Sequence, residues 1–116
     1  MPVLLLTVAF FTGCYNNNEE LLYGNQTEDC STVQAKFSTD ILPIVNTKCA
    51  ISGCHNAAAA TNSSGFTLQT FDQLKDKVDR IHVRVVTQKT MPPTGPLLPA
   101  EIDKFKCWIA SGALNN

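Results

Sequence analysis

The fold of this 116-residue chain is decided by residues 49–55, Cys-Ala-Ile-Ser-Gly-Cys-His. Two cysteines followed directly by a histidine are how a polypeptide holds a haem covalently, because both thiols add to vinyl groups and the imidazole becomes the proximal ligand of the iron. The usual spacing is C-x-x-C-H, whereas four residues separate the two thiols here. We therefore expect one covalent haem c at Cys49, Cys54 and His55.

Met91 is the candidate for the second axial position of the iron. Its thioether is a neutral, soft ligand, and Pro92 and Pro93 stiffen the segment that presents it. Two other interpretations stay open. His82 could complete a bis-histidine site instead, or Met91 could be an apolar residue that only fills space.

The amino-terminal residues predict export and a lipid anchor. Residues 3–11 are almost wholly apolar and too short to span a bilayer, which is typical of a signal peptide over residues 1–13. A small residue precedes Cys14, so we expect this cysteine to be lipidated. Residues 14–36 then form a polar tether and loop. The alternative is an ordinary cleaved signal with an incidental cysteine.

The chain has five cysteines, and this count leaves two of them for a disulfide. If Cys14 carries lipid and the motif cysteines carry haem, Cys30 and Cys107 remain. Export implies an oxidising compartment, so the two can pair. Two free thiols are the alternative.

The rest of the chain predicts short helices and long loops, with no run that favours a sheet. We expect a first helix from the capping residues at 38–40 to about residue 48, a second over 71–78 capped by Thr70, and a weak third over 79–86. Prolines and a glycine exclude helix from residues 90–99. The buried face of the final helix, which ends at Gly112, is expected to comprise Ile102, Phe105, Trp108 and Ile109.

Residues 37–116 resemble a small class I mono-haem cytochrome c domain, of the kind found in lipoproteins of Bacteroidota and Planctomycetes. The resemblance rests on the helix before the C-x4-C-H motif, on Met-Pro-Pro at 91–93, on Leu-Pro-Ala-Glu-Ile at 98–102 and on Trp-Ile-Ala-Ser-Gly-Ala at 108–113. It implies an all-α, loop-rich fold of three to five short helices around one haem. It also implies that Cys49 and Cys54 are the thioether attachments, with His55 and Met91 as the axial iron ligands.

The expected function is electron transfer without catalysis, in a lipoprotein of the bacterial cell envelope, periplasmic or in the outer membrane. Its partners would be redox proteins that the sequence does not identify, and the membrane that holds its anchor. A net charge of −1 gives no reason to expect nucleic acid. Two alternatives belong to other classes: a haem sensor or peroxidase-like domain with a labile sixth ligand, and a haem-free structural lipoprotein stabilised by zinc or by a disulfide at the motif cysteines.

Overall fold

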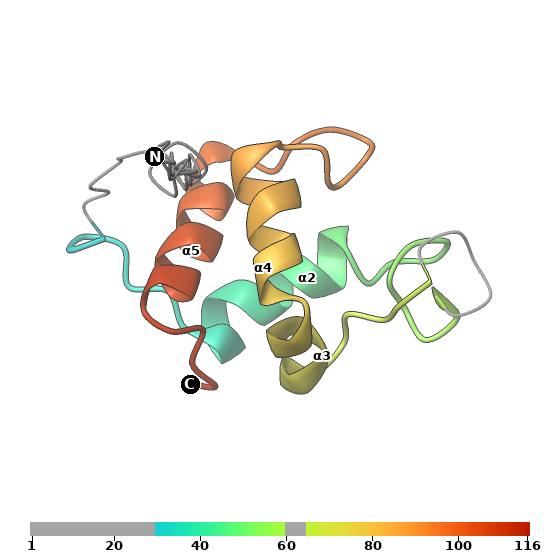
Figure 1. Cartoon of the computed structure of the whole chain (residues 1–116), viewed down its shortest axis with the longest axis horizontal. Coiled ribbons are helices and arrows are strands. Elements are labelled where there is room, and N and C mark those ends of the chain that lie inside the picture. Colours follow the sequence, from blue (N-terminus) through green and yellow to red (C-terminus); the bar gives the residue numbers. More distant parts are fainter. Residues whose placement is uncertain (1–29, 60–64) are drawn as a thin grey trace, which may run out of the picture.

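The computed structural model describes residues 30–59 and 65–116, and within these ranges the chain is helical and contains no strand. The elements in chain order are η1 (Phe37–Ile41), α2 (Leu42–Lys48), α3 (Phe71–Asp76), α4 (Val78–Ile81), η3 (His82–Thr87) and α5 (Pro99–Ala110), where η denotes a π-helical segment. The ribbon in Figure 1 shows α4 beside α5, with a long loop leading from η3 into α5. The expected all-α class is confirmed for the described residues.

The first helix starts one residue earlier than predicted, and its cap comes from the other end of the chain. It begins at Phe37, without a side-chain cap from its own neighbours. Instead, the amide of Phe37 donates to Oδ1 of Asn116 at 2.9 Å, and the amide of Ser38 donates to the Asn116 carbonyl at 2.8 Å. The prediction of a local cap at Ser38, Thr39 or Asp40 is therefore wrong, because a residue distant in sequence satisfies these amides.

The η1 and α2 segments join into one helix with a widened turn at its start. The amide of Ile41 donates to Lys36 O, and that of Leu42 donates to Phe37 O, both five residues back. This widened turn ends directly before Pro43, which has no amide hydrogen to donate. Pro43 thus lies in the first turn of α2, directly after the π-helical segment.

The later helices agree closely with their predicted positions. Thr70 caps α3 with a reciprocal capping box: its hydroxyl accepts from the Gln73 amide, and the Gln73 side chain accepts from the Thr70 amide. The weakly predicted third helix exists as α4 continued by η3. Helix α5 begins at Pro99, where a backbone N–H would have no acceptor within the helix, so proline loses no hydrogen bond there. Gly112 follows the end of this helix with a φ of +99°.

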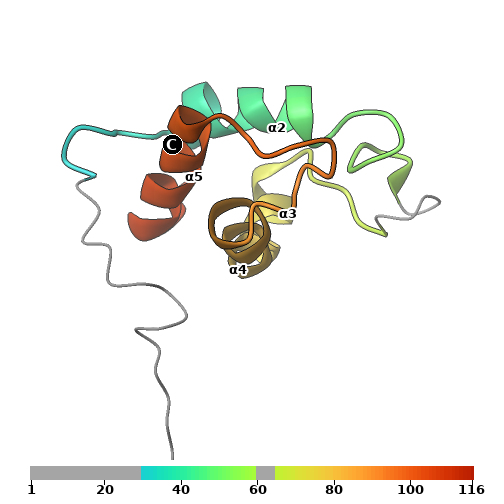
Figure 2. The same ribbon diagram turned by 90° about the horizontal axis from the view of Figure 1, so that it is seen from above.

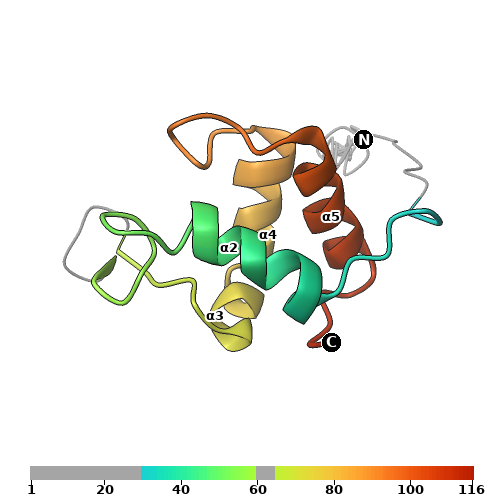
Figure 3. The same cartoon turned by 180° about the vertical axis from the view of Figure 1, so that it is seen from behind.

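The core lies where α5 packs against η1 on one side and η3 on the other. Trp108 is completely buried, and its ring lies 5.9 Å from that of Phe37, which meets Phe71 edge to face at 5.2 Å. The views from above and from behind show α2 crossing the α4 and α5 pair (Figures 2 and 3). Three of the four residues expected on the buried face of the last helix are buried, whereas Ile109 is only partly buried.

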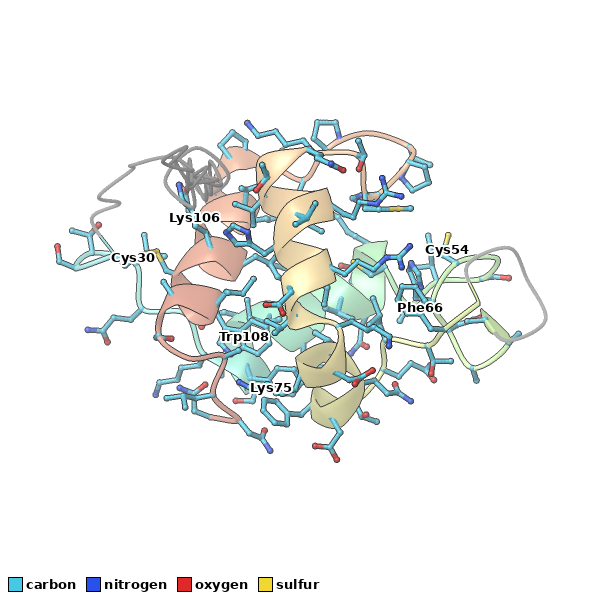
Figure 4. The ribbon with its side chains drawn as sticks, viewed as in Figure 1. Cys30, Cys54, Phe66, Lys75, Lys106 and Trp108 are labelled. Carbon is cyan, nitrogen blue, oxygen red and sulfur yellow. A yellow bond between two sulfur atoms is a disulfide. The ribbon has the colours of Figure 1, made fainter. Side chains whose placement is uncertain are left out.

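A disulfide ties the segment before the first helix to α5. Cys30 and Cys107 are bonded across 77 positions of sequence, as the cysteine count predicted. Figure 4 shows Cys30 at the side of α5, at the opposite end of the molecule from Cys54. The bridge therefore braces the helical core and lies away from the motif cysteines.

We expect the Cys30→Ala/Cys107→Ala variant to lose about 4 kcal/mol of unfolding free energy, because closing a loop of this length restricts the unfolded chain. Urea titration followed by circular dichroism measures the difference between oxidised wild type and variant. A reductant should shift the wild-type midpoint and leave the variant unchanged. Equal midpoints for oxidised and reduced wild type would show that the bridge contributes nothing.

Candidate cofactor-binding site

One cavity of about 300 Å³ collects the predicted site residues from two separate parts of the chain. Cys49, Cys54 and His55 line it from the loop after α2, and Met91 lines it from the loop after η3. Its volume is at the lower end of the range of ligand pockets, roughly 300–1,000 Å³. His82, the rival ligand, is not among the residues that line this cavity.

Apolar side chains from four different segments form the interior walls of the cavity. They are Val45, Leu68, Ile81, Val85 and Phe105. All five are buried. The walls are therefore a continuation of the hydrophobic core, and they would favour a flat apolar ligand over water.

The loop between the two cysteines folds back on itself and absorbs the long spacer. The Cys49 amide continues the helix by donating to Val45 O at 2.9 Å, and the Cys54 amide donates to Ile51 O at 3.0 Å in a tight turn. Gly53 has a φ of +81°, a conformation that glycine adopts without strain. The His55 amide then donates to Cys49 O at 2.9 Å, which closes the loop. Four intervening residues therefore still return the histidine to the first cysteine.

The His55 ring is held by Phe66 in two ways. Its Nδ1 lies 2.9 Å from the Phe66 carbonyl oxygen, and the two rings are 4.5 Å apart at a tilt of 34°. A carbonyl oxygen can only accept, so Nδ1 carries the hydrogen and Nε2 keeps its lone pair. This is the tautomer that a histidine needs to ligate a metal through Nε2, with the partner on Nδ1 fixing its orientation.

The backbone around Met91 is anchored to the end of η3. The amides of Thr90 and Met91 both donate to the Arg84 carbonyl, at 2.8 and 3.2 Å. Met91 is half-buried against the core, and Pro92 and Pro93 line the cavity beside it. The thioether thus belongs to a segment whose position is set on both sides, which lowers the entropic cost of presenting it.

The motif cysteines are free thiols in this structure. Burial first, and then the neighbouring Cys54 and Glu101, raise the pKa of the Cys49 thiol to about 11, while Lys48 opposes them. Cys49 therefore stays protonated at neutral pH. The two thiols are not joined to each other, in contrast to the alternative of a small disulfide at the motif.

The basic side chains around the cavity were not predicted as part of the site. Lys48, Lys77, Arg80 and Arg84 line it, and no aspartate or glutamate of residues 30–59 and 65–116 does. Lys77 and Arg80 both lie over the Phe66 ring, at 5.9 and 5.7 Å from its centroid. The signal that could have found them is the spacing of cations at 77, 80 and 84 beside apolar Ile81 and Val85.

Comparison with models of protein families, with curated proteins and with solved structures gave no match. Among the residues that the structure describes, no group of three or more His, Cys, Asp or Glu side chains is arranged to hold a metal ion. In the same residues, no helix is both long and apolar enough to cross a membrane. The predicted signal peptide, the lipidated Cys14 and most of the tether lie outside the described residues.

The raised pKa of Cys49 predicts slow alkylation of the folded, haem-free protein. A thiol with a pKa of about 11 instead of 9.0 has roughly a hundredfold less thiolate at pH 8. Iodoacetamide should therefore modify Cys49 roughly a hundredfold more slowly in the folded chain than in the urea-unfolded chain. Peptide mass spectrometry separates Cys49 from the other thiols. The rate should keep rising up to pH 11, and a plateau near pH 9 would contradict the assigned environment.

Proposed function

We propose that this protein is an exported electron carrier of the class I cytochrome c type, with one covalently attached haem. The observation that carries the proposal is the convergence of Cys49, Cys54, His55 and Met91 on a single apolar cavity. Cys49, Cys54 and His55 are close in sequence, but Met91 lies in another loop. The four residues therefore come together only through the tertiary fold. Two thiols, one imidazole and one thioether are the complete set that such a haem requires.

The residues present fit this cofactor in their chemistry as well as their position. Cys49 and Cys54 are unbridged and able to form thioethers with its vinyl groups. The Phe66 carbonyl sets the His55 tautomer, leaving Nε2 to ligate iron. Met91 would supply the opposite ligand, and a Met/His pair favours the ferrous state. When bound, the haem supplies a metal that gains and loses one electron.

Electron transfer is favoured over catalysis by what lines the cavity. Among the described residues that line the cavity, His55 is the one histidine and would serve as an iron ligand, and none carries a carboxylate that could act as a general acid or base. Because His55 and Met91 would both hold the metal, the chain would leave no position on it for a substrate. The chain's own contribution is to exclude water with the core-derived walls and to fix ligand geometry.

The proposed setting is the bacterial cell envelope, with Cys14 as a lipid anchor. An anchor would hold the domain at a membrane surface, close to redox proteins that donate and accept electrons. The Cys30–Cys107 disulfide is consistent with an exported protein, because disulfides persist in oxidising compartments.

Covalent attachment is tested by expressing the full chain in a host that matures c-type cytochromes. The purified protein should carry the mass of one haem, and a pyridine haemochrome spectrum should report thioether-linked haem. Cys49→Ala/Cys54→Ala should abolish covalent attachment, because no sulfur remains in the motif. Cys30→Ala/Cys107→Ala is the matched control and should keep the haem. A colourless wild-type product with no added mass would refute the proposal.

The role of Met91 is tested by Met91→Leu, which keeps the volume of the side chain and removes the sulfur. Such a swap usually costs less than about 1.5 kcal/mol, so the fold should persist. We expect loss of the low-spin spectrum, rapid carbon monoxide binding to the reduced protein and a lower reduction potential. His82→Gln is the control and should leave the spectrum and potential unchanged. If Met91→Leu is silent, Met91 only fills space; if His82→Gln has the effect instead, the site is bis-histidine.

A further inference from the structure

The cavity carries more positive charge than the chain as a whole would suggest. The net charge of the protein is −1, yet in the part of the chain that the structure describes four basic side chains and no acidic one line this cavity. Two of the four are neutralised locally: Lys48 pairs with Glu101 at 3.2 Å, and Lys77 pairs with Asp76 at 2.6 Å. Arg80 and Arg84 account for the remaining positive charge.

These two guanidinium groups have no ion-pair partner within the described part of the chain. Arg84 reaches only neutral acceptors, Oε1 of Gln88 at 3.4 Å and Oγ1 of Thr90 at 3.5 Å. Arg80 lies over the Phe66 ring, which leaves its N–H donors for another acceptor. Both residues stand one turn apart on the continuous α4–η3 helix, where like charges repel. A ligand with two negative groups would remove that repulsion.

We propose that Arg80 and Arg84 bind the two propionate carboxylates of the porphyrin. The inference rests on the proposed function, since it concerns the same cavity and the same cofactor. A porphyrin of this kind is apolar over most of its surface and anionic at one edge. The cavity has the matching pattern, with buried aliphatic and aromatic walls and a pair of cations on one helix. Guanidinium groups suit carboxylates because their parallel N–H donors match the two oxygens.

The placement of Arg80 also links the carboxylate edge to the iron ligand. Arg80 packs on the face of Phe66, whose carbonyl orients His55. Figure 4 shows Phe66 beside the cysteine loop, close to Cys54. A carboxylate that holds Arg80 in place would therefore also support Phe66, whose backbone carbonyl sets the histidine tautomer.

The test uses mesohaem, whose ethyl groups cannot form thioethers, so the full chain with its native cysteines can be titrated reversibly. Mesohaem and its dimethyl ester differ only in the charge of the two propionates. We expect wild type to bind mesohaem about tenfold more tightly than the ester, with the dissociation constants measured by absorbance titration. Arg80→Gln/Arg84→Gln should reduce this preference to about twofold or less, by weakening mesohaem binding and leaving ester binding nearly unchanged.

Two further variants keep the test independent of folding and of overall charge. Lys36→Gln/Lys104→Gln removes the same charge from residues outside the cavity lining and should keep the tenfold preference. Arg80→Lys/Arg84→Lys retains the charge and should keep most of the tenfold preference for mesohaem over its ester. Equal affinity of wild type for mesohaem and its ester overturns the inference, and leaves an acidic redox partner as the ligand of these arginines. Failure of wild type to bind either compound overturns the proposed function itself.

Discussion

The packing of α5 against η1 is the constraint on which the rest of the molecule depends. Trp108 is completely buried beside Phe37, and its indole Nε1 donates to Leu114 O at 2.9 Å, which draws the carboxyl-terminal segment back over the helix. That return places Asn116 at the start of η1, where it satisfies two amides of the first helix. The first helix and the carboxyl-terminal part of the chain are therefore held together by core packing, by the Asn116 cap and by the Cys30–Cys107 bridge.

The cavity is a consequence of this arrangement and of two local anchors. Helix α2 delivers the cysteine loop, whose hydrogen bond from His55 N to Cys49 O keeps the motif closed. The Arg84 carbonyl accepts from two consecutive amides and so fixes where the Met91 loop begins. Because α5 contacts η3 as well as η1, one packing solution brings both loops to the same space. The preorganised thioether and imidazole then need little further ordering to meet a cofactor.

The two arginines at the cavity differ in their ion pairing from charged side chains elsewhere on the surface. The pairs Lys48–Glu101 and Lys104–Asp40 are partly exposed bridges between helices or their ends, and contribute little individually. Arg80 and Arg84 instead line the cavity and form no ion pair among the described residues. Two cations one turn apart on one helix are slightly unfavourable, which is why the proposed ligand is one with two negative groups.

The sequence by itself determined the helical class, the capping of α3 by Thr70, the end of α5 at Gly112 and the pairing of Cys30 with Cys107. The first three depend on local residue chemistry, and the disulfide follows from the number of cysteines. Both kinds of information can be read from a single sequence. It also nominated Cys49, Cys54, His55 and Met91 from their side-chain chemistry. Only the tertiary structure decided that these four residues line one cavity and that His82 does not line it. It also decided that Phe66 orients His55 and that Asn116 caps the first helix. Each of these is a contact between residues that the chain order separates, so no local pattern could have revealed it.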